Sequence, residues 1–88
     1  MEKTKENLVA ETRKWLERLE KKAKTVKSTG KMSEEHMKEV IRNMNAYISD
    51  CKHFMEIDDW VRAYEAVIYA WGIYETLVRL NLIEGRID

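Results

Sequence analysis

The 88-residue sequence contains no proline, three glycines and one cysteine. Folds built from many short β-strands need turns every few residues, and proline and glycine supply many of those turns. Their scarcity therefore favours a few long helices. The single cysteine, Cys51, excludes a disulfide within one chain and is typical of a protein that stays in a reducing compartment.

Long uncharged runs are missing as well. The longest, residues 66–74, is far shorter than the roughly 20 residues that a membrane-spanning helix needs. The first residues, MEKTKENLVAETRK, lack the apolar core of a secretory signal peptide. We therefore expect a cytoplasmic protein with no membrane partner.

Hydrophobic residues make up 44% of the chain and charged residues 36%, which is too apolar for a disordered chain. The 16 basic and 16 acidic side chains cancel in number but not in position. Residues 1–31 hold ten Lys or Arg and five Asp or Glu, whereas residues 32–88 hold six and eleven. This asymmetry disfavours non-specific binding by the whole molecule and leaves a local basic patch near the start.

Apolar residues recur at three- and four-residue steps in three segments, which predict helices at about 4–28, 33–55 and 58–80. Gly30 is the expected end of the first helix, and Ser33 is the expected N-cap of the second. Asp58 interrupts the second apolar stripe, so it or Asp59 is expected to begin the third helix.

Helices of similar length with short joints predict an all-α antiparallel three-helix bundle, with residues 1–88 as one domain. The joints are expected near Gly30 and Ile57. An alternative is that the second and third helices fuse into one kinked helix and that two chains exchange helices.

The third segment is apolar over most of its circumference and is therefore expected to lie in the middle of the bundle. One row is mainly aromatic and the next is rich in alanine, which lets a neighbouring helix approach closely. Gly72 costs roughly 1 kcal/mol in a helix relative to alanine, and we expect close packing of a helix or a large side chain there to compensate. The positions expected to be largely buried are Trp15, Leu19, Ile41, Met44, Ile48, Val67, Ile73 and Leu77.

The C-terminal half resembles the archaeal family known as domain of unknown function 357. The matching positions are Tyr47, Asp50, Phe54, Asp59, Ala63, Ala66, Tyr69, Ala70, Gly72, Arg79, Leu80 and Leu82. Asn81 stands where that family usually has glycine, and asparagine can still adopt the left-handed conformation. The resemblance implies a compact three-helix bundle of archaeal, cytoplasmic type, and it implies no activity.

Two surfaces are candidates for binding. A polar strip on the third helix comprises Arg62, Glu65, Tyr69, Gly72 and Arg79. Tyrosine and arginine are enriched at protein interfaces, so we expect this strip to contact a second copy in a homodimer, or another protein. We expect its charged residues to form the intrahelical ion pairs Arg62–Glu65 and Glu75–Arg79.

The alternative surface is the lysine-rich segment 21–31, whose candidate phosphate contacts are Lys21, Lys22, Lys24, Lys27 and Lys31. It would serve a nucleic-acid-binding accessory protein, although the segment contains neither arginine nor an aromatic residue. We expect no catalytic, metal or cofactor-binding residues. Cys51 and His53 lie two positions apart, so a helix directs them to different faces, and Cys51 belongs to the apolar stripe. The expected function is non-enzymatic association with itself or with another protein.

Overall fold

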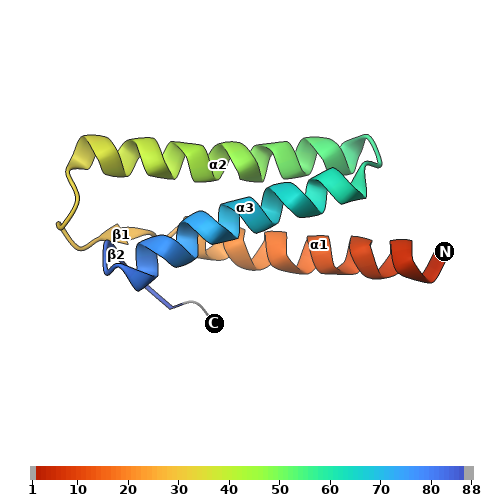
Figure 1. Ribbon diagram of the computed structural model, residues 1–88, viewed down its shortest axis with the longest axis horizontal. Helices are drawn as coiled ribbons and strands as arrows, with labels where there is room; N and C mark the ends of the chain where they lie inside the picture. Colours follow the sequence, from red (N-terminus) through yellow and green to blue (C-terminus); the bar gives the residue numbers. More distant parts are fainter. Residues whose placement is uncertain (1, 87–88) are drawn as a thin grey trace.

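The computed structural model describes residues 2–86, which form three helices and one short strand pair (Figure 1). The elements are α1 (Glu2–Ala23), β1 (Lys27–Ser28), α2 (Glu34–Glu56), α3 (Trp60–Arg79) and β2 (Ile83–Glu84). Successive helices run in opposite directions along the long axis of the molecule, so α2 is antiparallel to α1 and α3. This arrangement confirms the predicted three-helix bundle.

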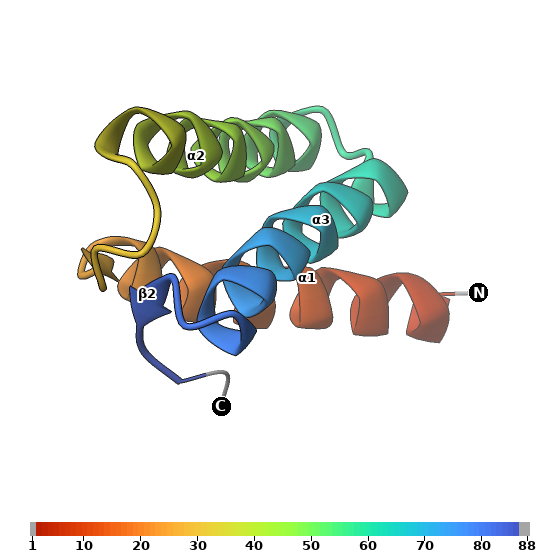
Figure 2. The same cartoon turned by 60° about the vertical axis from the view of Figure 1, so that its left-hand side comes forward.

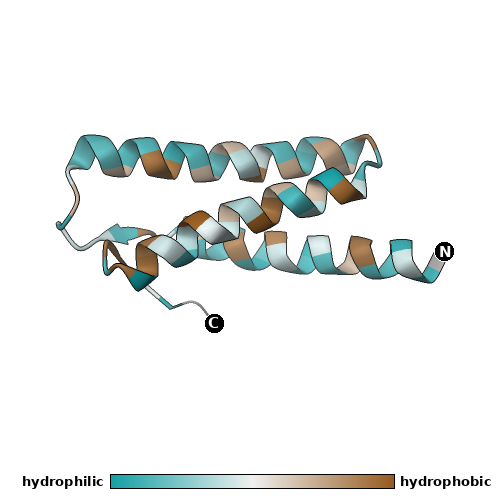
Figure 3. Ribbon diagram, viewed as in Figure 1, coloured by the Kyte–Doolittle hydropathy of each residue, from teal (hydrophilic) through white to brown (hydrophobic). Residues whose placement is uncertain are grey.

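The last helix, α3, lies between the other two. Both views show α1 and α2 on opposite sides of α3 (Figures 1 and 2), and α1 and α2 make little contact with each other. Apolar positions are correspondingly dense along α3 (Figure 3). The central placement expected from its two apolar rows is therefore observed.

The aromatic row of α3 forms the contact with α1. Trp71 donates a hydrogen bond from Nε1 to the backbone carbonyl of Trp15 at 2.9 Å, and the two rings meet edge to face at 5.6 Å. Arg13 lies over the ring of Trp60 at 5.4 Å. Because buried indole N–H groups need a partner, the first of these contacts fixes the position of α1 along α3.

The alanine row lies on the other side of α3, where α2 approaches closely. Ala63, Ala66 and Ala70 are all buried, and the backbones of α2 and α3 make the most extensive helix contact in the described chain. Small side chains permit this short separation, whereas the larger aromatic residues fill the wider space toward α1.

The predicted core is largely correct, with three exceptions. Five of the eight residues are buried: Leu19, Met44, Ile48, Val67 and Leu77. Trp15, Ile41 and Ile73 are half-buried and pack against the core from its edge. They stay partly exposed because α1 and α2 do not close over one another.

The predicted end of the first helix lies too far along the sequence. The helix ends at Ala23 and not at Ser28, and Gly30 (φ +86°) lies in the connection to α2. Lys27 and Ser28 instead pair antiparallel with Glu84 and Ile83. The run after Ala23 contains β-branched Thr25, Val26 and Thr29, which lose side-chain freedom in a helix, and the hydroxyl of Thr29 donates to the Asn81 carbonyl at 2.6 Å.

The joint between α2 and α3 lies where it was predicted, at residues 57–59. Asp58 adopts a left-handed φ of 61°, and the side chain of Asp59 accepts a hydrogen bond from the Arg62 amide at the start of α3. The alternative of one fused, kinked helix is therefore wrong. Ser33 caps α2 by accepting from the amide of His36, as expected.

Leu77 provides a test of the core, because its side chain is only 3% exposed. Leu77→Ala should lower the free energy of unfolding by about 2–5 kcal/mol, the usual cost of emptying a well-packed leucine site. Urea unfolding followed by circular dichroism measures the change. The control is Leu80→Ala, at a residue 60% exposed, which should change stability by less than about 0.5 kcal/mol. Equal effects of the two substitutions would contradict the packing.

Asp58 provides a pH-dependent test of the α2–α3 joint. Its carboxylate accepts from Lys5 Nζ at 2.9 Å and from Trp60 Nε1 at 2.7 Å, and these hydrogen bonds lower the pKa of Asp58 below its ordinary 3.8. A carboxyl whose pKa is lowered by folding stabilises the protein above its unfolded-state pKa, and this stabilisation is lost as the pH falls through the folded-state pKa.

We therefore expect Asp58→Asn to destabilise the protein at pH 7, with a difference from wild type that shrinks as the pH falls below about 4. Urea unfolding from pH 7 to pH 2.5 measures that difference. Asp50→Asn, at an exposed carboxylate of α2, is the matched control and should show a smaller pH-dependent change. A destabilisation by Asp58→Asn that is constant with pH would refute the ionic contribution.

Candidate functional site

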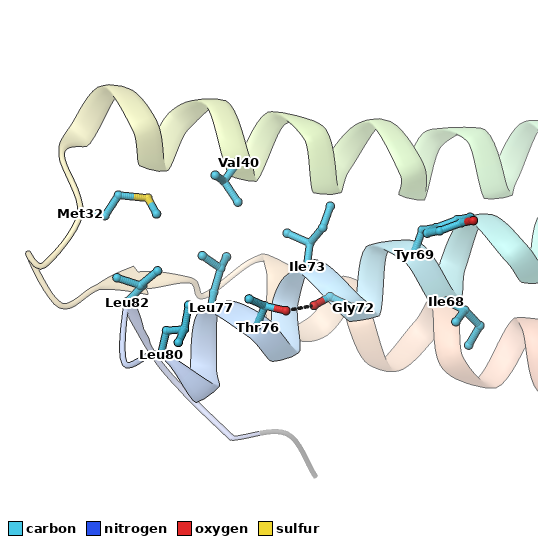
Figure 4. Close-up of a pocket in the computed structure, with 10 residues that line it drawn as sticks. All are labelled: Met32, Val40, Ile68, Tyr69, Gly72, Ile73, Thr76, Leu77, Leu80 and Leu82. Atoms are coloured by element: carbon cyan, nitrogen blue, oxygen red, sulfur yellow. Dashed lines mark hydrogen bonds between the residues drawn. The ribbon is translucent and has the colours of Figure 1, made fainter.

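An apolar groove of about 570 Å³ lies on the outer surface where α3 meets α2 (Figure 4). Its walls come from both helices and from the two connections at one end of the bundle. The lining residues are Met32, Val40, Ile68, Tyr69, Gly72, Ile73, Thr76, Leu77, Leu80 and Leu82. No charged side chain is among them.

The groove lining has two side-chain hydroxyls, those of Thr76 and Tyr69. Thr76 donates its hydroxyl to the carbonyl of Gly72 at 2.8 Å, which leaves its methyl group facing the groove. The ring of Tyr69 stacks on Tyr47 of α2 at 5.5 Å. The surface therefore offers shape and apolar contact, with little hydrogen-bonding capacity for a small polar ligand.

The groove is open to solvent along α3. The exposed fractions are 42% for Ile68, 63% for Tyr69 and 60% for Leu80, high values for large apolar side chains gathered on one face. A second hollow of about 330 Å³ shares Ile68 and Tyr69 and extends to Tyr64 and Glu65. The two hollows together follow α3 for most of its length.

The predicted strip of Arg62, Glu65, Tyr69, Gly72 and Arg79 is exposed throughout, and it runs along the edge of the groove. One of its expected ion pairs is wrong, because Arg62 pairs with Asp59 at 3.6 Å. Glu65 thus has no ion-pair partner among residues 2–86. The other expected pair is present, with Arg79 4.0 Å from Glu75.

Sequence reasoning found Tyr69 and Gly72 but missed most of the groove. Ile68 belongs to neither apolar row of α3. Its position one turn before Gly72 could have indicated that it lies on the same exposed face. Met32 and Leu82 come from connections, and only the folded chain brings them beside Val40. The surface is therefore more apolar than the strip suggested.

The five lysines of segment 21–31 differ in their contacts within the chain. Lys21 pairs with Glu17 at 3.6 Å, and Lys22 donates to the Arg86 carbonyl at 2.9 Å. The other three are exposed and make no ion pair among residues 2–86: Lys24, Lys27 and Lys31. A hollow of about 600 Å³ between α2 and the end of α1 adds two cationic wall residues, Lys38 and Arg42.

The thiol of Cys51 is buried in the hydrophobic core. Burial raises the pKa of the Cys51 thiol to about 11, and Cys51 Sγ lies 3.9 Å from Met55 Sδ. A thiol in that state is a poor nucleophile at neutral pH. Within residues 2–86, no three His, Cys, Asp or Glu side chains gather as a metal site would require. None of the described helices is long and apolar enough to cross a membrane.

Gly72 lies inside α3, where a glycine lowers helix stability, and no packing contact within the described part of the chain requires it. The expected close packing against it is wrong, since a Cβ placed there would meet no atom within 4 Å of its own chain. The chain thus accepts a helix-interior glycine, which costs roughly 0.5–1 kcal/mol relative to alanine, without an internal contact that requires it.

At low protein concentration, Gly72→Ala should therefore raise the free energy of unfolding by about 0.5–1 kcal/mol. Gly85→Ala is the matched control and should lower it, because Gly85 has φ +152° and its Cβ would lie 2.6 Å from the hydroxyl oxygen of Tyr74. Urea unfolding gives both values. Destabilisation by both substitutions would show that Gly72 has a role within the folded chain.

Fold and groove together define a small all-α protein of three helices with an open apolar surface between the second and third. Residues 14–83 match the family described as protein of unknown function (DUF357), and the chain belongs to that family. The solved structure of protein AF1782 from Archaeoglobus fulgidus, assigned to the same family, is 35% identical to it. The two superpose with a TM-score of 0.79 over 94% of this chain and 99% of the other. A search of curated proteins finds no match.

Proposed function

We propose that this chain is a non-enzymatic protein-association module and that its contact surface is the α2–α3 face, by which we mean the ten groove residues together with the strip Arg62, Glu65, Tyr69, Gly72 and Arg79. The observation that carries the proposal is the exposed apolar groove with no charged residue in its lining. Large apolar side chains gathered on an exposed face are typical of surfaces that another protein covers.

The composition of the α2–α3 face supports this proposal. Interface centres are depleted in charged residues and enriched in tyrosine and methionine, with arginine common at contacts. Here Tyr69 and Met32 belong to the lining, while Glu65 and Arg79 lie outside the larger hollow along α3. This is the arrangement of an apolar centre with a charged rim.

The absence of enzymatic activity is part of the same proposal. It is supported by the buried, weakly acidic thiol of Cys51, which lies outside the groove lining, and by the Thr76 hydroxyl, which donates its hydrogen to the Gly72 carbonyl. We also assign the protein to the cytoplasm, since a single buried cysteine suits a reducing compartment.

A photo-crosslinking amino acid, benzoylphenylalanine, tests the proposal when it replaces Tyr69 in the full chain inside cells. The exposed aromatic position accepts this larger ring. We expect crosslinks to a protein, either a second copy or another chain. The matched control carries the same group at Ser49, which is exposed on the side of α2 opposite Val40 and Tyr47, and should give at least about tenfold less crosslinked protein.

No protein crosslinks at Tyr69, or equal crosslinking at both positions, would overturn the proposal. The second candidate function, a nucleic-acid accessory role, is favoured by the unpaired Lys24, Lys27 and Lys31 beside the cationic hollow. Salt-sensitive retention of RNA or DNA that is lost in a variant with these three lysines replaced would support that role.

A further inference from the structure

We propose that the occupant of the α2–α3 face is a second copy of this chain, placed so that the two α3 helices run antiparallel and cross at Gly72 about a two-fold axis. This inference rests on the proposed function and specifies the partner, its direction and its register. Closed two-fold dimers use the same surface on both chains, so a face that pairs with itself must be self-complementary. The α2–α3 face meets that requirement in three ways.

Gly72 provides the crossing point. It is exposed, it lies in the helical interior of α3 two turns before the end, and a Cβ there would face open space in the single chain. Helices approach most closely where a small residue lies at their contact, because no side chain separates the two backbones. In the dimer each Gly72 faces its own copy across the axis, which accounts for a glycine that the isolated chain does not need.

The charges on either side of Gly72 are complementary in this register. Glu65 lies seven residues before Gly72 and Arg79 seven residues after it, so each lies about two turns from the crossing point on the same face of the helix. An antiparallel two-fold axis through Gly72 places Glu65 of one chain beside Arg79 of the second copy. The symmetry forms this pair twice.

Neither group has a close ion pair within the described residues of the single chain. Glu65 has no ion-pair partner among residues 2–86, and Arg79 reaches Glu75 only at 4.0 Å. A parallel pair of α3 helices in register would place Glu65 beside Glu65 and Arg79 beside Arg79, where like charges repel. The charges therefore favour the antiparallel arrangement.

The apolar residues fit the same symmetry. Ile68 lies four residues before Gly72 and Thr76 four residues after it, so Ile68 of one chain lies over the Thr76 methyl of the other. The Thr76 hydroxyl is already bonded to the Gly72 carbonyl and needs no partner in the interface. The groove beside this contact, lined by Leu77, Leu80 and Val40, is covered by the flank of the second helix.

Charge reversal tests the register directly. Sedimentation of the wild type should show a concentration-dependent dimer, and E65R or R79E alone should raise the dimer dissociation constant at least about tenfold. The double variant E65R/R79E restores opposite charges across the axis and should return to within about threefold of wild type. The control E11K/K14E reverses an exposed ion pair of α1, 2.9 Å long, and should leave dimerisation unchanged.

A cysteine at the crossing point gives an independent measurement. In Gly72→Cys the two new thiols would meet across the axis, so mild oxidation should convert most of the protein into a disulfide-linked dimer. The native Cys51 is buried and should not form a disulfide under these conditions. Ser49→Cys, exposed on the opposite side of α2, is the control and should remain largely monomeric.

The outcomes separate this inference from the function on which it rests. A wild type that stays monomeric at the highest accessible concentration overturns the second copy, and crosslinking of Tyr69 to a different protein would then leave the proposed function intact. Single charge variants that weaken the dimer without rescue in the double variant overturn the antiparallel register. Efficient oxidation at Gly72 together with charge rescue supports it.

Discussion

The fold depends on one constraint, which is that α3 is apolar on two sides and must be covered on both. The aromatic row receives α1 through Trp71 and Trp15, and the alanine row receives α2 at close range. Because α1 and α2 both pack their apolar faces against α3, little apolar surface remains for contact between them. The molecule is therefore an open layer of three helices, and the outer edge between α2 and α3 stays uncovered. The groove is a consequence of this arrangement.

The connections fix the positions of the helices through left-handed backbone conformations and a few contacts between residues distant in sequence. Asp58 and Asn81 both adopt left-handed φ values, of 61° and 56°, at the ends of α2 and α3. Asp58 also reaches Lys5 near the start of α1, and Thr29 reaches Asn81. Each end of the bundle thus has a tie between α1 or its following connection and a helix terminus. These ties supplement the small direct α1–α2 contact, in which Lys52 pairs with Glu20.

Features encoded within a few residues of sequence were predictable. Capping and turn signals depend on immediate neighbours in the sequence, as at Ser33, Asp58 and Asp59. The predictions of the second joint and of the start of α2 are therefore confirmed. The end of α1 was missed because β1 forms only with β2, more than 50 residues away, and local periodicity holds no information about that partner. The resemblance to the family is confirmed by the match over residues 14–83.

The surface proposed for association was only half predictable for a related reason. The strip on α3 follows from helical spacing, and its exposure is confirmed. The groove beside it needs the relative placement of Val40, Met32 and Leu82, which spacing within one helix cannot give. Ile41 and Ile73 were expected to be largely buried because they lie on the apolar stripes of their helices. Their partial exposure reflects the same open layer that creates the groove.

The central position of α3 also has a consequence for how the chain folds during synthesis. The chain reaches α3 only after α1 and α2, yet both main helix interfaces involve α3, and β1 pairs only with β2. During synthesis the segment before Trp60 consequently emerges as two amphipathic helices with little core to share. Their apolar stripes stay exposed to water until α3 and β2 follow. Folding is then a single late event and not a stepwise growth from the N-terminus. During that interval the dense charge of both helices opposes association of their exposed apolar stripes.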